Sequence, residues 1–324
     1  MQTQRHKYLR SGNATTLQST LIHGRCSQTI SEVRLMKECV HAGCPSKQST
    51  HWNNERENSL QLTARVVYSS GFDAELLSSF RLLRFAQVAF HMQPYKGRTD
   101  QSVHDNIKYI IDTYGKHDAF YRFQSSTGRV LPLFYVYDSY LLPPESWAEL
   151  LSTKGSHSIR GTPYDGVFVA LIVEERHKHD ILASGFDGIY TYFASNGFSF
   201  GSSHQNWKAI KAFCDANNLL FIPSVGPGYV DTAVRPWNNH NTRNRVNGRY
   251  YDTSLQAALS VRPEVVTITS FNQWHEGTQI EKAVPKKTVT RLYLDYKPNQ
   301  PDHFLVLTRQ WAENFNKEKD TWLM

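Results

Sequence analysis

A run of polar, aromatic and acidic residues restricts the possible folds more than any other part of the chain. It follows residues 265–269, Val-Val-Thr-Ile-Thr, an apolar and β-branched segment typical of a buried strand. Positions 271–276 then read Phe-Asn-Gln-Trp-His-Glu. The interior of a strand does not use such a succession of side chains. The end of a barrel strand, where ligand sites are assembled, does.

Apolar segments recur from about residue 85 onward, and helical patterns separate them. The strand candidates are residues 87–92, 130–137, 166–172, 188–193, 219–225 and 265–269. The helical patterns cover residues 101–114, 144–151, 177–183, 203–217 and 254–259. This alternation predicts parallel strands joined by right-handed crossovers. Because the strands are continuously apolar, both faces of the sheet should be covered, as in a (β/α) barrel or a doubly wound sheet.

Polar or aromatic residues end nearly every predicted strand, and this favours the barrel. Gln93 and Tyr95 follow the first strand, and Tyr190 and Tyr192 end the fourth. A doubly wound sheet would gather its site at one switch point, often beside a glycine-rich phosphate loop, and no strand here is followed by one. We therefore predict an α/β fold, a (β/α)8 TIM-type barrel, with about six of its eight strands recognisable.

Length and charge limit the domain organisation and the partners. We expect residues 1–80 to form an irregular or disordered lead segment, because they are polar and lack periodicity, and residues 81–324 to form the barrel domain. The net charge is +7, but no basic run or nucleic-acid motif accompanies it, so we expect no nucleic-acid partner. No stretch reaches the ~18 apolar residues that cross a bilayer. His177 and His179 lie in a charged pattern, so we expect no metal and no cofactor.

Glu276 is the candidate general acid, because its carboxyl group could protonate a departing sugar oxygen. Glycosidases pair two carboxylates, ~5–5.5 Å apart for retention and ~6.5–9.5 Å apart for inversion. Gln273 lies three positions earlier, where the second carboxylate would be expected. An amide has no usable proton affinity near neutral pH. The alternative is a polar strand end that caps the following loop.

Two further groups of residues are candidates for binding. Tyr190 and Tyr192 alternate on a predicted strand and therefore face one side, either toward a site or within the core. Arg235 and Trp237 lie in a long loop after the fifth strand. Trp237 could stack on a sugar face and Arg235 could hold a hydroxyl or carboxylate group, or the tryptophan could simply fix a surface loop.

Several longer motifs carry a resemblance to a known family. They are residues 133–140 (LFYVYDSY), 185–193 (GFDGIYTYF), 222–229 (IPSVGPGY), 235–238 (RPWN) and 274–281 (WHEGTQIE). On these motifs the chain, from about residue 87 to 320, resembles the glycoprotein endo-α-1,2-mannosidases of glycoside hydrolase family 99. The resemblance implies a (β/α)8 barrel and metal-independent, retaining, endo-acting cleavage of an α-1,2-mannosidic bond.

The resemblance also implies a substrate, a compartment and a mechanism. The substrate is a glucosylated high-mannose N-glycan, which the family trims in the Golgi. One carboxylate deprotonates the sugar's own 2-hydroxyl, which attacks the anomeric carbon, and a second carboxylate protonates the leaving group. Carried over to this chain, the acid is Glu276, and Gln273 occupies the position of the base. The matching binding set is Tyr192, Arg235, Asn272, Trp274 and His275, with Gln93, Tyr95 and Tyr190 at neighbouring strand ends.

Gln273 leads us to expect weak hydrolysis or none. A glycan-binding pseudoenzyme is the first alternative, because an amide keeps the hydrogen bonds of the pocket while removing turnover. The second alternative is a truncated product that does not close its barrel. It arises because residues 1–80 do not align with the two further strands, the stem and the membrane anchor of the family.

Overall fold

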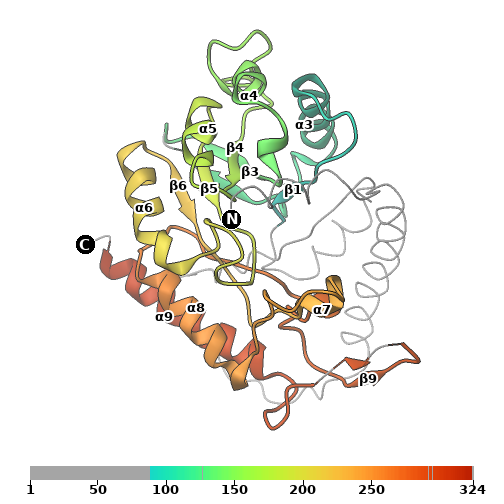
Figure 1. The fold of residues 1–324 in the computed structure, drawn as a ribbon. Coiled ribbons are helices and arrows are strands. Elements are labelled where there is room, and N and C mark those ends of the chain that lie inside the picture. The colour runs from blue at the N-terminus through green and yellow to red at the C-terminus, as the bar shows by residue number, and fades with distance from the viewer. Residues whose placement is uncertain (1–87, 126, 291, 294, 323–324) are drawn as a thin grey trace. The chain divides into compact units, whose positions relative to one another are not determined.

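Parallel strand pairing forms the centre of the described part of the chain (Figure 1). The computed structural model describes residues 88–322 except 126, 291 and 294, so the expectation for residues 1–80 lies outside it. The main sheet runs in the order β1-β3-β4-β5-β6, and all of these neighbours are parallel. Its strands are β1 (Phe90–Met92), β3 (Val130–Val136), β4 (Val167–Leu171), β5 (Gly188–Tyr190) and β6 (Leu220–Ile222). β2 (Arg122–Gln124), which no sequence pattern predicts, pairs with β3 in antiparallel orientation.

The strand expected over residues 219–225 is divided at Pro223. The part before it is β6, which pairs with β5, and the part after it is β7 (Ser224–Val225), which pairs in parallel with β8 (Thr267–Ile268). Proline has no N–H to donate to a ladder, but the Pro223 carbonyl accepts the N–H of Thr267 at 3.0 Å. The chain therefore changes its pairing partner at this residue. Among the described residues the pairing does not close into a ring.

Helices cover the outer side of the strands (Figure 1). α3 (Asp100–Tyr114), α4 (Pro144–Leu151), α5 (His177–Ala183), α6 (Trp207–Ala216) and α8 (Arg249–Leu259) all overlap the predicted helical patterns. Thr99 and Ser102 form a capping box that begins α3, and a proline occupies the first turn of α4. α8 begins at Arg249 rather than at residue 254, so the pattern located this helix but not its start.

Other elements have no counterpart among the predictions. They are α7 (Asp231–Val234), α9 (His303–Trp322), the hairpin of β9 (Lys286–Lys287) and β10 (Leu292–Tyr293), and the 3-10 turns η1 (Ser139–Leu141), η3 (Val246–Gly248) and η4 (Trp274–Glu276). The 3-10 turn η2 (His204–Asn206) lies inside the helical pattern predicted over residues 203–217 and leads directly into α6. α9 lies along α8 (Figure 1), where Tyr251 bonds to Thr308 at 3.0 Å and the Trp311 indole donates to Asp252 at 2.7 Å.

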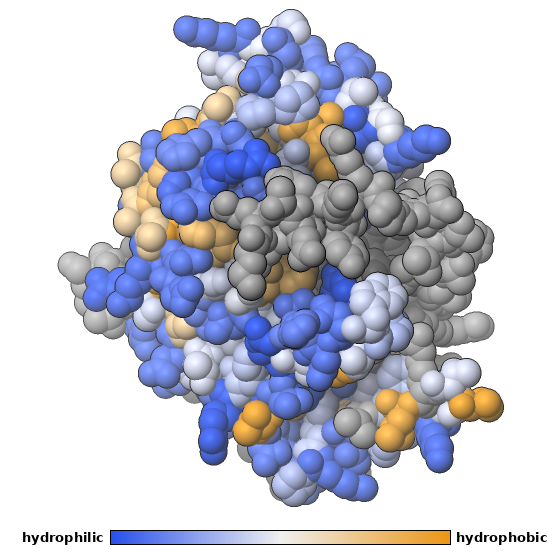
Figure 2. Space-filling view, in the orientation of Figure 1, coloured by the Kyte–Doolittle hydropathy of each residue, from blue (hydrophilic) through white to orange (hydrophobic). Residues whose placement is uncertain are grey.

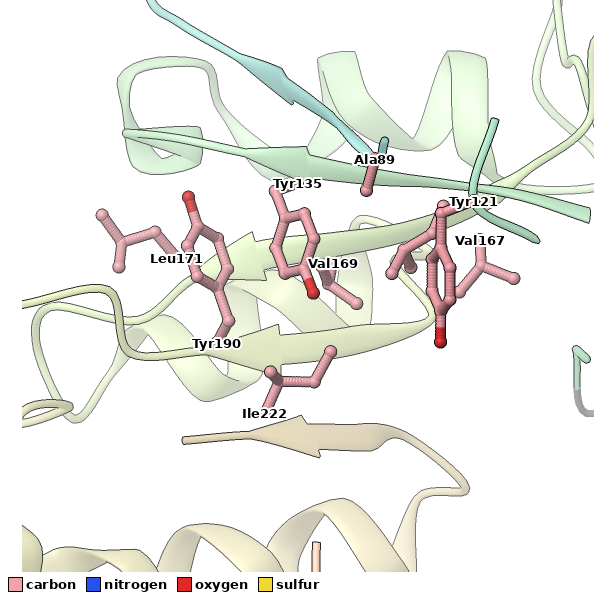
Figure 3. Packing of buried hydrophobic residues seen from close by; sticks show 9 residues of the cluster. Ala89, Tyr121, Tyr135, Val167, Val169, Leu171, Tyr190 and Ile222 are labelled. Atoms are coloured by element: carbon pink, nitrogen blue, oxygen red, sulfur yellow. The ribbon is translucent and has the colours of Figure 1, made fainter. Parts of the chain in front are cut away.

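Alternate residues of β3 and β4 face opposite sides of the sheet. Phe134 and Phe168 are register partners on one side, and their rings stack 5.0 Å apart. On the other side the rings of Tyr135 and Tyr190 meet edge-on at 5.2 Å (Figure 3). The cluster on this side contains Ala89, Tyr121, Leu133, Tyr135, Val167, Val169, Leu171, Tyr190 and Ile222. Burial of both faces explains why the strands read as continuous apolar runs.

Figure 2 shows the polarity of one face of the molecule. The face in Figure 2 is mainly hydrophilic, and its orange areas are separate patches. Single exposed apolar side chains of this kind are normal on folded proteins. In the part of the chain that the structure describes, no helix combines the length and the apolar character needed to span a membrane.

Arg160 joins the N-terminal ends of β4 and β5. Its guanidinium donates to the carbonyls of Gly166 at 2.8 Å and Gly185 at 2.7 Å. It also pairs with Asp165 at 3.2 Å and Asp187 at 2.9 Å. These residues lie at the end of the strands opposite to their polar tips, where a barrel of this type usually places stabilising residues.

We expect Arg160→Met to lower the free energy of unfolding by about 3 kcal/mol, because Asp187 loses the cation that offsets its burial and Asp165 keeps only its pair with Arg129. Chemical denaturation of the full chain measures this change. Arg176→Met is the control, since the Arg176 side chain is 70% exposed and an exposed ion pair contributes at most about 1 kcal/mol. Equal losses in the two variants would contradict the prediction.

Candidate functional site

Hydroxyl groups join the ends of β5, β7 and β8. Ser224 Oγ accepts the N–H of Tyr192 at 2.9 Å, and the Ser224 N–H donates to Thr191 Oγ1 at 2.8 Å. Thr269 Oγ1 donates to the Tyr192 carbonyl at 2.6 Å, and Thr267 Oγ1 contacts the Ser224 hydroxyl. Together these bonds hold Tyr192 in the left-handed region, at φ 58°, which tyrosine does not favour. The position of this aromatic ring is therefore imposed by its neighbours.

Two glycines let the loop after β7 meet the loop after β8. A Cβ atom at Gly226 would lie 2.5 Å from the carbonyl oxygen of Thr269, directly after β8, and one at Gly277 would lie 2.7 Å from Val230 Cγ2. Gly277 also has φ 66°, a conformation that side chains disfavour. With this space available, the N–H of Val230 donates to the Glu276 carbonyl at 2.8 Å. The backbone of the candidate acid is thus tied to the neighbouring strand end.

The loop of residues 270–281 is closed on itself. The Ser270 N–H donates to the Thr278 carbonyl at 2.8 Å, and the Ser270 hydroxyl contacts the Thr278 hydroxyl at 2.8 Å and accepts the Gln273 N–H at 2.9 Å. The indole of Trp274 donates to Glu281 Oε2 at 2.9 Å. Trp274 therefore braces the turn that carries Glu276, rather than only lining a surface.

The Glu276 carboxylate lies within electrostatic range of two phenol groups. Burial raises the pKa of Tyr137 above its usual range, and the nearby Tyr192 phenol and Glu276 carboxylate add to this shift. Burial likewise raises the pKa of Tyr229 to about 12, with the positive charge of Arg235 opposing the shift and Glu276 adding to it. The rings of Tyr137 and Tyr192 meet edge-on at 4.6 Å. Glu276 is thus close enough to both phenols to act on them electrostatically, and both stay protonated at neutral pH.

Arg235 is held in place by the short helix α7. Its Nη1 donates to Asp231 Oδ1 at 2.9 Å and to the Tyr229 hydroxyl at 3.2 Å, and its guanidinium lies 5.5 Å from the ring centre of Phe198. The Asp231 side chain is 0% exposed, and its second oxygen accepts the N–H of Asn241 at 3.2 Å. The buried carboxylate therefore fixes the direction of an arginine that is itself partly exposed.

A buried imidazole connects two of the candidate binding residues. The Gln93 amide nitrogen donates to His91 Nδ1 at 2.8 Å, so the ring proton is on Nε2, which lies 2.9 Å from the Tyr190 hydroxyl. The His91 ring also packs against Tyr137 and Tyr192, with centroids 5.6 and 5.7 Å away. His91 is 1% exposed. His91 thus links Gln93, by a hydrogen bond, to the packed rings of Tyr137 and Tyr192.

The candidate residues from the sequence do not all lie in one place. The structure brings Glu276, Tyr192 and Arg235 together through Tyr137 and Tyr229. Asn272, Gln273, Trp274 and His275 lie half-buried on the same loop as Glu276.

Three other candidates are placed differently. Tyr190 is fully buried in the inner cluster, behind the tips. Tyr95 is exposed, and its hydroxyl contacts Ser102 and Asn106 of α3. Trp237 is 82% exposed on the loop after α7.

Four residues of this arrangement are absent from the set chosen on sequence: His91, Tyr137, Tyr229 and Asp231. The first three lie at or near strand ends, but many residues outside the site do so as well, and their position in the sequence therefore does not identify them. Asp231 precedes Arg235 by four positions, which is the spacing of a helical ion pair and the one sequence signal for this contact. That spacing has meaning only inside a helix, and α7, with four residues, is too short for helical periodicity to be visible in the sequence.

The described residues show no other site of comparable chemistry. They contain no group of three or more His, Cys, Asp or Glu side chains able to hold a metal ion. A cavity of about 230 Å³ borders α8 but is lined by none of the candidate residues. Three of its polar residues already bond to one another, since Tyr250 accepts the N–H of Asn196 at 2.9 Å and Asn196 accepts the N–H of His204 at 3.0 Å. The converging side chains at the strand tips therefore define the candidate site.

Comparison with known proteins identifies similar sequences and structures. The model of glycosyl hydrolase family 99 matches residues 70–317. The chain is 83% identical over 238 residues to a glycoprotein endo-alpha-1,2-mannosidase-like protein of Danio rerio, and 63% identical over 238 residues to the glycoprotein endo-alpha-1,2-mannosidase of Mus musculus. Each match covers 74% of this chain and 54% or 52% of the relative. The chain thus spans about half the length of the curated relatives that it matches.

A solved structure of the same family has a similar fold. The GH99 endo-alpha-mannosidase of Bacteroides thetaiotaomicron, in complex with bis-tris-propane, superposes with a TM-score of 0.71 at 48% identity, covering 76% of this chain and 74% of that one. The expected family resemblance and the TIM-type barrel class are confirmed. Six barrel strands lie within the described residues, β6 and β7 being the two parts of one of them.

We expect Asp231→Asn to lower the free energy of unfolding by about 2–3 kcal/mol and to release Arg235, because the amide NH2 would face either the guanidinium or the Asn241 N–H, both of which are donors. Thermal unfolding together with a crystal structure of the variant measures both effects. Thr232→Ala, an exposed change in the same helix, is the control. An unchanged Arg235 in the variant structure would contradict the role given to Asp231.

Proposed function

The chain belongs to glycosyl hydrolase family 99, and on this premise we propose that its strand tips bind an α-mannoside and hydrolyse the glycosidic bond slowly. One observation carries the proposal. Glu276, Tyr192 and Arg235 come from three different strand ends and converge through Tyr137 and Tyr229. A carboxylic acid, phenols and a guanidinium are the groups that bind sugar hydroxyls and protonate a leaving oxygen.

Each of these groups has a distinct part in the proposed reaction. Glu276 donates its proton to the glycosidic oxygen as the bond to the anomeric carbon breaks. Tyr137 and Tyr229 are neutral at neutral pH, as an ordinary phenol is, and burial raises their pKa values further. Tyr137 can donate a hydrogen bond to the sugar or to Glu276, while the Tyr229 hydroxyl donates to Asp231 Oδ1 at 3.4 Å and can accept from a sugar hydroxyl. Arg235 is fixed by Asp231 and offers its remaining N–H groups to a hydroxyl.

Gln273 makes the proposed turnover slow. In the mechanism that the family resemblance implies, a base at this position takes the proton of the sugar's 2-hydroxyl while that oxygen attacks the anomeric carbon and the leaving sugar takes the Glu276 proton. Water then adds to the anomeric carbon, which breaks the bond to the 2-oxygen and restores the 2-hydroxyl. The amide cannot take the 2-hydroxyl proton, and loss of a general acid or base costs ~10²–10⁴ in rate. This residue also favours a second candidate function, glycan binding without hydrolysis, because an amide preserves the hydrogen bonds of the pocket.

The relatives suggest the substrate class. Proteins named glycoprotein endo-alpha-1,2-mannosidase support an α-1,2-linked mannose unit of an N-glycan as the bond cleaved. We extend the proposal to a glucosylated high-mannose N-glycan as the substrate and to the Golgi as the compartment, on the family resemblance. Endo-acting cleavage would release a glucosyl-mannose disaccharide, which distinguishes this reaction from exo-mannosidase trimming.

We expect Gln273→Glu to raise the rate of disaccharide release from a glucosylated high-mannose glycan by ~10²-fold or more, because the carboxylate restores the missing base. Release of the disaccharide by the full chain is measured by mass spectrometry, and glycan binding by calorimetry.

Two control variants accompany this measurement. Gln256→Glu adds the same charge on the exposed side of α8 and should not change the rate. Glu276→Gln should abolish the gain in the Gln273→Glu background. If the natural chain already matches Gln273→Glu, the limiting role of the amide is wrong. If neither form binds or cleaves the glycan, the proposed function is wrong.

A further inference from the structure

Arg245 contacts the backbone of the loop that follows Glu276. It precedes η3, and its Nη2 donates to the carbonyl oxygens of Gly277 at 2.9 Å and Gln279 at 2.7 Å. Gly277 is the next residue after Glu276. One guanidinium nitrogen therefore binds the backbone on the C-terminal side of the candidate acid at two points.

Aromatic rings, not carboxylates, surround this arginine. Its guanidinium lies 5.0 Å from the ring centre of Tyr296 and 4.5 Å from that of Phe304. The described residues give it no ion pair at 4.0 Å or less, unlike Arg160 and Arg235. Burial lowers its pKa to about 10, so it remains charged at neutral pH. A cation with these neighbours has its strongest hydrogen bonds to the loop carbonyls, because charge-assisted bonds are the stronger kind.

Tyr296 strengthens the same support. Its hydroxyl lies 2.6 Å from the Glu281 carbonyl and 3.2 Å from the Gln279 carbonyl, and its single proton is donated to one of them at a time. Tyr296 is 5% exposed, and its ring packs edge-on against Phe304 at 4.7 Å. Arg245 and Tyr296 thus supply hydrogen-bond donors to the carbonyls of alternate residues 277, 279 and 281.

The other side of the acid is fixed as well. The Val230 N–H donates to the Glu276 carbonyl at 2.8 Å, and Gly277 has no room for a side chain against Val230. Glu276 is therefore held between α7 on one side and the Arg245 support on the other. A displacement of ~1 Å in a catalytic group can cost ~10²-fold in rate.

We propose that Arg245 is a positioning residue for Glu276: its hydrogen bonds to the Gly277 and Gln279 carbonyls set where the carboxyl group lies relative to Tyr137, Tyr229 and Arg235. The proposal rests on the proposed function only in calling Glu276 the acid. Arg245 contacts no substrate and acts through the backbone. Its loss would remove both bonds to the Gly277 and Gln279 carbonyls and leave the loop held by its internal bonds, by Val230 and by Tyr296.

The first test needs no activity. NMR spectra of the full chain, labelled at glutamate carboxyl carbons, report the surroundings of Glu276, and Glu276→Gln identifies its signal. Arg245→Met should shift or broaden that signal. Arg245→Lys should leave it closer to the natural position, because one ammonium can still reach a carbonyl. Arg160→Met is the matched control: it removes a partly buried arginine that binds backbone carbonyls at the opposite end of the strands, and it should leave the signal unchanged.

The second test measures catalysis in the Gln273→Glu background. Arg245→Met should lower kcat per folded molecule by ~10- to 100-fold with KM changed by less than about threefold, since the acid is displaced while the sugar contacts remain. Arg160→Met should lower stability without changing kcat per folded molecule. Absence of hydrolysis in the parent Gln273→Glu chain would count against the proposed function, and the NMR test would still decide the role of Arg245.

Two outcomes would overturn the proposal. One is a Glu276 signal in Arg245→Met that superposes on that of the natural chain. The other is equal kcat values for Arg245→Met and its parent. If Arg245→Met does not fold, Tyr296→Phe decides, because it removes the donor to Glu281 and keeps the aromatic ring. It should move the Glu276 signal in the same direction by a smaller amount, and an unmoved signal would overturn the proposal.

Discussion

Parallel pairing of β1, β3, β4, β5 and β6 is the constraint on which the rest of the structure depends. It brings the carboxyl ends of these strands to one edge, so residues distant in sequence meet there. His91 of β1 reaches Tyr190 at the end of β5 for this reason, across 99 positions of the chain. Burial of both sheet faces keeps the register fixed, because a shift by one residue would exchange the inner and outer side chains.

The strand ends become a site through contacts that the strands themselves do not supply. Ser224 and Thr269 bind the backbone of Tyr192, Asp231 directs Arg235, and Arg245 and Tyr296 support the loop after Glu276. Apart from Asp231, which lies four residues before Arg235 in the same segment, these partners come from segments other than the one they hold. The site therefore depends on several loops being correctly placed at once, which suits a reaction in which a small displacement of the acid is costly.

Much of the fold was predictable because its signals are local. All six predicted strands and five helical patterns lie where apolar continuity and periodicity place them. The exceptions have physical reasons. Residues 219–225 are one apolar run, but Pro223 lacks the N–H that a continuous ladder needs, so the run divides between two partners. β2 and α7 are three and four residues long, too short for any periodicity to appear.

The sequence alone determined the barrel class, the family and the loop that holds Glu276, because these depend on apolar period, on motif and on residue order. Gln273 in place of a carboxylate was equally visible, since it is a matter of identity. Only the tertiary structure decided which side chains face one another. Tyr190 proved to be buried behind the tips, while Tyr137, Tyr229 and Arg245 lie around or beneath the acid. The direction of a side chain at a strand end is set by its neighbours in space, and these neighbours cannot be read from the order of residues in the sequence.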